Sequence, residues 1–233
     1  ADLAYQVVKY QSRDGWSHRD ALRLSHPKAD NLELNTILKW AVGKTGETQL
    51  PGVIAAFEAA KVAKESKEII TLIRDYNLSR EMLPTQFLND PAVWEALLEK
   101  MPLTAMIRNL GKMSNVGLLK PMSKAAGVIV SRLTNQEYLQ RSRVHPLVLL
   151  VALKVYQQGK GDKGSLKWEP VSQVVDALDK AFYLSFGNVE PANKRTLLAL
   201  DVSGSMGSGE MAGMTGITPR VGSAAMALLT AAT

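Results

Sequence analysis

The chain has 233 residues, 46% of them hydrophobic, which is enough for a packed core and argues against a disordered protein. It has no cysteine, which excludes disulfides and thiolate metal sites and agrees with a reducing, cytoplasmic location. The net charge of +6 favours an anionic partner, either nucleic acid or a membrane surface. No apolar run reaches the ~18 residues of a membrane span, and we expect no membrane partner.

Most of the chain is predicted to form short amphipathic helices. Apolar residues recur at helical spacing, and prolines or glycines separate the runs. Ser17 and Asp20 are spaced as in a capping box, and Asp90 before Pro91 is typical of a helix start. The expected helices cover residues 2–10, 18–24, 31–42, 53–60, 69–76, 91–101, 102–113, 121–133, 135–143, 146–158 and 170–186, with a final helix from about residue 219.

This series of helices favours a HEAT-like helical repeat, in which each helix pair buries its apolar stripe against the next pair. A closed helical bundle is the alternative that the residues alone leave open. The run 146–158 is apolar nearly all round, so we expect it to be buried centrally.

The segment LLALDVSGSM has a different pattern. Its apolar run, 196–200, predicts a strand buried on both faces, and the run ends at Asp201. Asp201, Ser203 and Ser205 offer three hard oxygens at alternate positions, which suits Mg²⁺. DVSGSM resembles the DxSxS metal-ion-dependent adhesion site (MIDAS) of von Willebrand A domains. The alternative is a Ser/Gly turn in which Asp201 caps a helix.

Two groups of basic residues lie on or next to predicted helices. Arg108 and Lys112 are four residues apart, opposite the apolar stripe of their helix, and form either an anion site or a solvated basic face. Arg141, Arg143 and His145 crowd the start of the apolar helix. Such a cluster can bind phosphates or bases, although a histidine before proline is otherwise a helix cap.

A third basic group is the loop GKGDKGSLKW, which holds Lys160, Lys163 and Lys167 among glycines. Free backbone amides and lysines suit phosphate oxygens. The loop is not a Walker A motif, because Ser165 stands where the lysine should be and a helix precedes it. ATP binding is therefore not expected.

No catalytic arrangement is readable in the sequence. The three histidines lack metal-ligand spacing, and no Ser/His/Asp set is evident. A metal-dependent hydrolase using Asp201 would need general acids and bases that we do not find. We expect no enzyme.

Four segments occur in this order along the chain: GWSHRDALRLSHPK, MPLTAMIRNLGKM, RVHPLVLLVALKVY with GKGDKGSLKW, and LLALDVSGSM. Together they resemble the 60-kDa Ro ribonucleoprotein autoantigen family, in which a TROVE module precedes a von Willebrand A domain. The resemblance covers nearly all of the chain. It implies a ring of HEAT-like repeats that binds small non-coding Y RNAs on its outer surface and the single-stranded ends of misfolded RNAs in a central hole.

The resemblance also implies particular residues and partners. His145 matches a position implicated in Y RNA binding, and Asp201, Ser203 and Ser205 match the metal ligands. An exoribonuclease is a further candidate partner. The divalent cation, Mg²⁺, belongs to the complete A domain, so we expect it to bind weakly or not at all here.

We therefore predict a mainly α chain, truncated at both ends, with a partial TROVE module over 1–190 and the start of an incomplete von Willebrand A domain over 191–233. The predicted function is an RNA-binding scaffold in non-coding RNA quality control. A metal-dependent protein-interaction module is the alternative. The predicted RNA contacts are His145, Arg143, Arg141, Arg108, Lys112, Lys160, Lys163 and Lys167.

Overall fold

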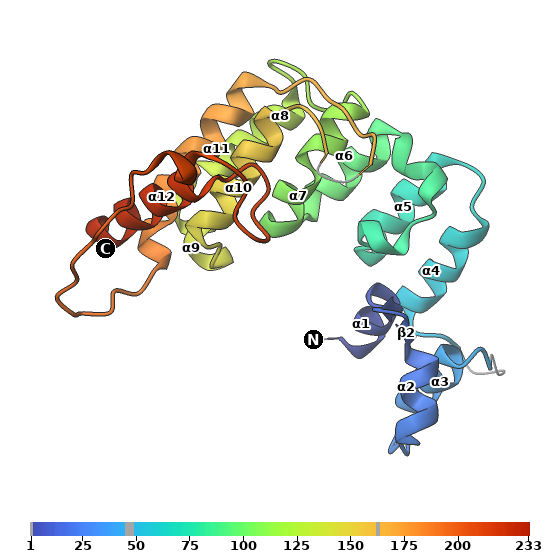
Figure 1. The fold of residues 1–233 in the computed structure, drawn as a ribbon. Coiled ribbons are helices and arrows are strands. Elements are labelled where there is room, and N and C mark those ends of the chain that lie inside the picture. Colours follow the sequence, from blue (N-terminus) through green and yellow to red (C-terminus); the bar gives the residue numbers. More distant parts are fainter. Residues whose placement is uncertain (1, 45–48, 162–163) are drawn as a thin grey trace. The chain divides into compact units, whose positions relative to one another are not determined.

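The computed structural model describes residues 2–44, 49–161 and 164–233 and confirms the mainly α class (Figure 1). The chain divides into two compact units, residues 1–100 and 101–233. This division falls inside the predicted TROVE module. Within the described parts, no helix is both long and apolar enough to cross a membrane.

The first unit begins with a helix and a small hairpin. Helix α1 (Leu3–Lys9) is capped by Asp2. Strands β1 (Ser12–Arg13) and β2 (Trp16–Ser17) pair antiparallel. Asp14 and Gly15 between them both have positive φ, 52° and 82°, as a type I′ hairpin turn requires. The sequence indicated no strand between the helices expected at 2–10 and 18–24, so the structure adds this hairpin.

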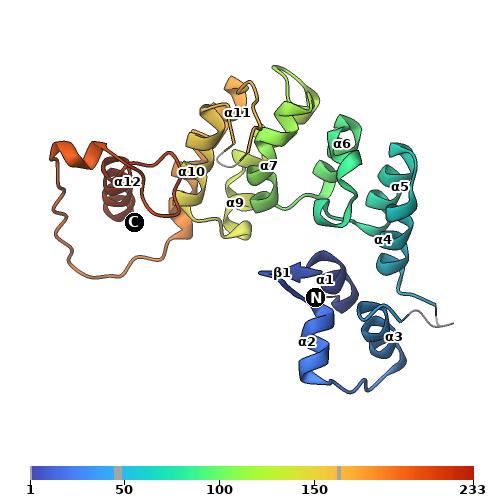
Figure 2. The ribbon, with the colours of Figure 1, turned by 45° about the vertical axis from the view of Figure 1, so that its right-hand side comes forward.

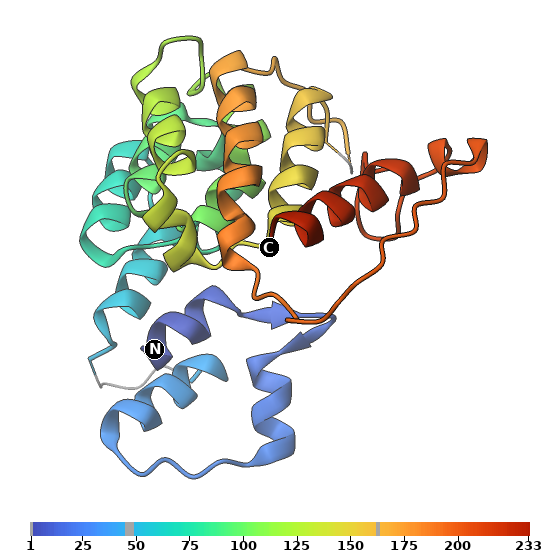
Figure 3. The ribbon, with the colours of Figure 1, turned by 90° about the vertical axis from the view of Figure 1, so that its left-hand side faces the viewer.

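The next two helices are joined by an extended connection (Figure 3). Helix α2 (His18–Ser25) starts with the predicted capping box, in which Asp20 Oδ2 accepts from the Ser17 backbone N–H at 3.0 Å and the Asp20 N–H donates to Ser17 Oγ at 3.4 Å. Helix α3 (Leu32–Ala41) is capped by Asn31. The capping prediction is confirmed.

The remaining helices of this unit pack on one another in succession. They are α4 (Gly52–Val62), α5 (Ser66–Tyr76) and α6 (Pro91–Lys100), with 3-10 turns η1 (Arg80–Met82) and η2 (Thr85–Asn89) between the last two. Helix α4 packs on α1 and α5, and α5 packs on α6. Trp94 is fully buried in α6 and donates Nε1–H to the Leu88 carbonyl at 2.9 Å. This apolar packing is the core of the first unit.

The second unit is a layered set of helices. They are α7 (Leu103–Asn115), α8 (Lys124–Leu133), α9 (Gln136–Ser142), α10 (Pro146–Gln157) and α11 (Ser172–Leu184). Helix α11 packs on α10 and α8, and α10 also packs on α7 (Figure 2). As predicted, α10 is buried where it packs on α11 and α7, but Val148 is 41% exposed.

Helix α8 starts three residues later than predicted. Ser123 accepts from the Ala126 N–H at 3.2 Å and so caps the helix. Met122 just before it has a φ of 62°, which is incompatible with an α-helical residue. The cap, rather than Pro121, therefore sets the helix start.

The buried strand predicted at 196–200 is wrong. The segment is irregular, and Figure 1 shows it as part of an open loop between α11 and α12 (Pro219–Ala232). Leu197 is 93% exposed and Leu200 is 49% exposed. A strand needs a neighbour for its backbone N–H and C=O groups, and among the described residues the one sheet is β1–β2. The apolar pattern of residues 196–200 does not indicate whether a neighbouring strand is present. The short turns η3 (Ser185–Asn188) and η4 (Gly204–Gly207) flank the loop.

Candidate nucleic-acid interface

The described ends of the lysine-rich loop after α10, residues 159–161 and 164–168, pair with each other, and we call these two segments the hairpin. The Trp168 N–H donates to the Gly159 carbonyl at 2.9 Å. Lys160 and Lys167 face each other across an antiparallel bridge. Both lysines are exposed. The bridge therefore holds two cations on neighbouring backbone positions, where they repel each other.

This hairpin packs on the second half of α7. The Asn115 side chain donates Nδ2–H to the Lys167 carbonyl at 2.8 Å. The Trp168 ring covers Gly111, and its Nε1–H donates to the Tyr156 carbonyl at 2.9 Å. The Trp168 and Tyr156 rings are stacked, with centroids 6.2 Å apart and an interplanar angle of 17°. These contacts fix the hairpin against both α7 and α10.

The packing brings two of the predicted basic groups together. Positions three, four and seven apart share one face of a helix, so Arg108 and Lys112 lie on the same stripe of α7 as Gly111 and Asn115. That stripe is the one the hairpin contacts. We call Arg108, Lys112, Lys160 and Lys167 the α7–hairpin cluster. Arg108 is exposed and Lys112 half-buried. Lys163, also predicted as an RNA contact, lies outside the described residues.

Sequence reasoning missed the residues that position this cluster. Trp168 and Asn115 hold the hairpin in place, and Gly111 makes room for the indole. The available signal was Trp168 at the end of the GKGDKGSLKW segment, because a tryptophan beside a polar loop usually packs against another part of the protein.

The third predicted group lies at the other end of α10. His145 is the N-cap of α10, with Nδ1 accepting the Leu147 N–H at 3.2 Å. Arg141 is in the last turn of α9, and Arg143 is its left-handed C-cap, with a φ of 50°. All three side chains are exposed. The rise of α10 separates this group from the hairpin by about 18 Å, so the structure contains two basic patches rather than one.

His145 therefore has the capping role that the sequence left open. An Nδ1 that accepts a hydrogen bond carries no proton, so Nε2 carries it. The exposed Nε2–H is not used by this cap. RNA contact by His145 stays a prediction that the cap geometry permits.

The predicted metal ligands form a local turn. Asp201 Oδ1 accepts the Ser203 N–H at 2.8 Å, and the Ser203 and Ser205 hydroxyl oxygens are 2.9 Å apart. Hydrogen bonding to the carboxylate by the backbone and side chain of Ser203 lowers the pKa of Asp201. The alternative of a Ser/Gly turn describes this geometry equally well, since all three residues are exposed.

The chemistry of the donor set suits Mg²⁺, which prefers hard oxygen ligands. The set has one carboxylate and two hydroxyls, and the other positions would be filled by water. In the described ranges no three Asp, Glu or His side chains gather into a metal-binding group. Metal binding at Asp201, Ser203 and Ser205 therefore stays a prediction.

Known proteins with similar sequences and structures cover nearly the whole chain. The TROVE domain model matches residues 1–77, 72–154 and 152–194. The RNA-binding protein RO60 of Deinococcus radiodurans is 45% identical over 231 residues, which is 97% of this chain and 43% of that protein. The RNA-binding protein RO60 of Caenorhabditis elegans is 40% identical over 254 residues, covering 88% of this chain and 39% of that protein.

The crystal structure of the Deinococcus radiodurans RO (RSR) protein has the same fold. It matches with a TM-score of 0.88 and 44% identity over 99% of this chain and 47% of that chain. The chain thus spans less than half the length of these relatives. Both RO60 relatives are named as RNA-binding proteins rather than as enzymes. The family model and the relatives together show that the chain belongs to the TROVE-domain family of RO60 proteins.

Proposed function

We propose that this chain is an RNA-binding part of a ribonucleoprotein and that the α7–hairpin cluster is one of its RNA contacts. The observation that carries the proposal is the bridge between Lys160 and Lys167, packed on the stripe of α7 that holds Arg108 and Lys112. Like charges held this close repel, and RNA phosphates placed among them turn that repulsion into attraction.

The family supports this proposal. Both curated relatives carry the name RNA-binding protein, and the TROVE match spans both basic patches. We further propose that small Y-type RNAs bind the outer basic surface and that ends of misfolded or single-stranded RNA enter the central cavity of the whole HEAT-like ring. The role would be non-coding RNA quality control in the cytoplasm, with an exoribonuclease as a partner. No catalytic step by this chain is part of the proposal.

The test compares two double variants of equal charge. Lys160→Ala with Lys167→Ala removes two cations from the cluster, and Lys124→Ala with Lys180→Ala removes two exposed cations elsewhere in the same unit. Binding of a single-stranded RNA and of a small structured RNA is measured by filter retention over a salt series. Each phosphate contact contributes roughly −0.7 to the log–log salt slope for single strands.

The cluster variant is expected to lose affinity for both RNAs and to flatten the slope by about 1.4 for the single strand. The matched control should change the slope less. Equal losses in the two variants would assign the binding to general charge and overturn the cluster. No salt-dependent retention by the wild type would overturn RNA binding itself.

A metal-dependent protein-interaction module is the second candidate. The turn at Asp201, Ser203 and Ser205 favours it, because Asp201 accepts the Ser203 N–H at 2.8 Å and the two serine hydroxyl oxygens lie 2.9 Å apart, so one short segment offers three hard oxygen donors. A bound Mg²⁺ would supply a coordination position for a partner's carboxylate. This candidate does not explain the α7–hairpin cluster, so it ranks second.

A further inference from the structure

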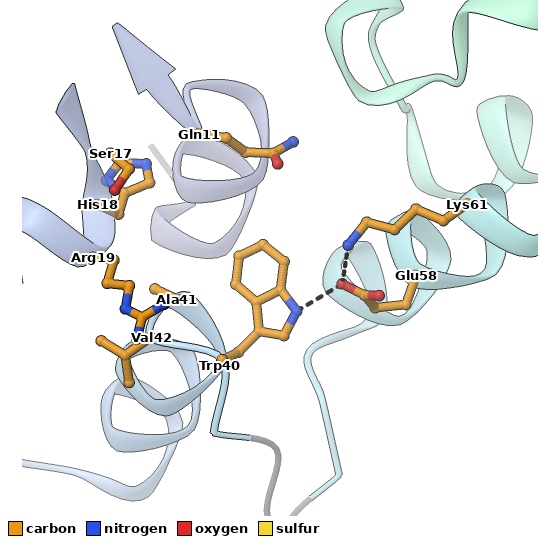
Figure 4. A pocket seen from close by; sticks show the side chains of 10 residues that line it. Gln11, Ser17, His18, Arg19, Trp40, Ala41, Val42, Glu58 and Lys61 are labelled. Atoms are coloured by element: carbon orange, nitrogen blue, oxygen red, sulfur yellow. Dashed lines mark hydrogen bonds and ion pairs between the residues drawn. The ribbon is translucent and has the colours of Figure 1, made fainter. Parts of the chain in front are cut away.

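The first unit contains a pocket that the sequence did not indicate (Figure 4). Its volume is about 470 Å³, in the range of sites that hold small organic groups. The pocket lies where the residue after α1, the start of α2, the end of α3 and the middle of α4 meet. It is lined by Gln11, Ser17, His18, Arg19, Trp40, Ala41, Val42, Gly43, Glu58 and Lys61.

An indole ring held in place forms one wall. Trp40 donates Nε1–H to Glu58 Oε1 at 2.9 Å, and Lys61 Nζ donates to the same oxygen at 2.7 Å. Phe57 meets the Trp40 ring edge-on, with centroids 6.0 Å apart. In Figure 4 the Trp40 ring stands between this Glu58–Lys61 pair on one side and the side chains from α2 on the other. The ring is therefore pre-positioned, so a flat ligand could stack on it without first ordering it.

The charges of the lining do not suit a bare phosphate. Arg19 and Lys61 are cationic, but Lys61 is already paired with Glu58. The N-terminus of α2, which would otherwise attract an anion, is closed by the capping box between Ser17 and Asp20. The carboxylate of Asp20 occupies the place where a phosphate would bind. A neutral flat group therefore fits the pocket better than an anion.

Polar atoms suited to the edge of a base lie in the wall. Gln11 donates Nε2–H to the Val8 carbonyl at 3.0 Å, which orients an amide whose Oε1 is an acceptor. His18 Nε2 is buried and has no hydrogen-bond partner among the described residues. An unsatisfied buried nitrogen in a pocket wall is a group that a ligand's hydrogen bond can compensate.

We propose that this pocket takes one unpaired nucleobase of a bound RNA, stacked on Trp40, with its edge toward Gln11 and His18. The inference rests on the RNA binding proposed above, and it identifies the place on the protein where one base of the RNA binds. Unstacked bases bound against aromatic side chains are the usual mode of single-stranded RNA recognition. Arg19 at the wall is the cation nearest the phosphates that flank such a base.

The experiment uses an RNA hairpin with a single-stranded tail that carries 4-thiouridine, and a fully paired duplex of the same length. Three variants are compared: Trp40→Ala, Trp40→Phe, and Tyr76→Ala as a matched loss of a half-exposed aromatic side chain outside the pocket. Irradiation cross-links the thiouridine to the side chain it stacks on, and trypsin releases Trp40 in the short peptide 40–44.

Trp40→Ala is expected to weaken binding of the tailed RNA about fivefold or more, with no change for the duplex and no change in salt slope. Trp40→Phe should retain most of the affinity because it retains an aromatic plane, and Tyr76→Ala should bind as the wild type does. The cross-link should map to peptide 40–44. This tail-specific loss is a readout that general destabilisation of the unit would not give.

The experiment distinguishes failure of the pocket inference from failure of the proposed function. If the wild type retains neither RNA, the proposed function is wrong and the pocket inference falls with it. If the wild type binds and Trp40→Ala binds the tailed RNA equally well, the pocket alone is overturned. If Trp40→Ala loses helicity, the pocket is tested instead by the RNA affinity of Trp40→Phe and by the cross-link in the wild type. A cross-link that maps outside peptide 40–44 overturns the pocket.

Discussion

The indole of Trp168 lies so close to Gly111 that a Cβ built on this glycine would be 2.7 Å from a ring carbon. Side chains do not tolerate such a distance, so the contact requires a glycine. It joins the hairpin to α7 and thereby assembles the α7–hairpin cluster. The proposed RNA contact therefore depends on glycine at position 111, because the methyl group of an alanine there would clash with the Trp168 ring.

Gly111→Ala should destabilise the second unit by about 1–3 kcal/mol, because the added methyl forces the Trp168 ring to move. Gly127→Ala is the matched control, since Gly127 is also helical but has no atom within 4 Å of the place that a Cβ would take. That substitution should stabilise by roughly 0.5–1 kcal/mol through helix propensity. Urea unfolding followed by circular dichroism measures both. Similar effects of the two alanines would show that the Trp168 contact is not tight.

His145→Ser separates the cap from the proposed RNA contact. Serine is a good N-cap, so α10 should keep its start and the free energy of unfolding should change little. Binding of a Y-type RNA should fall, because the imidazole is removed. His145→Ala is the control, and it should also cost about 1 kcal/mol of stability through the lost cap. Unchanged RNA binding in both variants would leave His145 a cap alone.

The capping box of α2 predicts a pH dependence. Hydrogen bonds from Ser17 lower the pKa of Asp20 below its ordinary value of 3.8. The stabilisation by Asp20 is therefore fully present above that ordinary value and is lost as the pH falls through the lower folded-state pKa. The protection of the first-turn amides of α2 against hydrogen exchange, measured relative to the intrinsic exchange rate at each pH, should fall over this acidic range. Asp20→Asn should remove the pH-dependent step, and a step that persists in this variant would assign it to another group.

Mg²⁺ binding at Asp201 should be in the millimolar range or weaker. The turn supplies one carboxylate and two hydroxyls, and Mg²⁺ gives up its water reluctantly for so few ligands. Hydrogen bonding by Ser203 lowers the pKa of Asp201 below its ordinary value of 3.8, so protonation does not limit binding at neutral pH. Isothermal titration with Mg²⁺ and Mn²⁺ is the measurement, and Asp201→Ala is the control. Micromolar affinity that this substitution abolishes would show that three ligands from one turn suffice.

Features that depend on near neighbours in the sequence could be predicted. The capping box needs Ser17 and Asp20 within one helical turn, and the helix starts at Pro91 and Pro146 follow from proline's fixed φ and missing N–H. The apolar stripe of α7 likewise identified the face that carries Arg108, because helical spacing is local.

Features that depend on distant partners could not be predicted. The strand expected at 196–200 needed another strand beside it, and no local pattern reports one. The α7–hairpin cluster depends on the contact of Trp168 with Gly111, and the pocket at Trp40 combines residues from four segments. Apolar periodicity indicates which face of a helix is buried, but it does not indicate which other helix or loop packs on that face.

The exposed apolar run after Lys194 and Arg195 has a consequence for how the protein behaves at high concentration. Leu197, Leu198 and Leu200 are exposed on a backbone segment that is paired with no strand of the described chain. Such a segment is a template on which a second copy can add its own. The two preceding cations oppose this self-association, because they come next to the same cations of the second copy when the two segments align in parallel. Salt screens them, so added salt should promote self-association, seen by light scattering, while it weakens RNA binding.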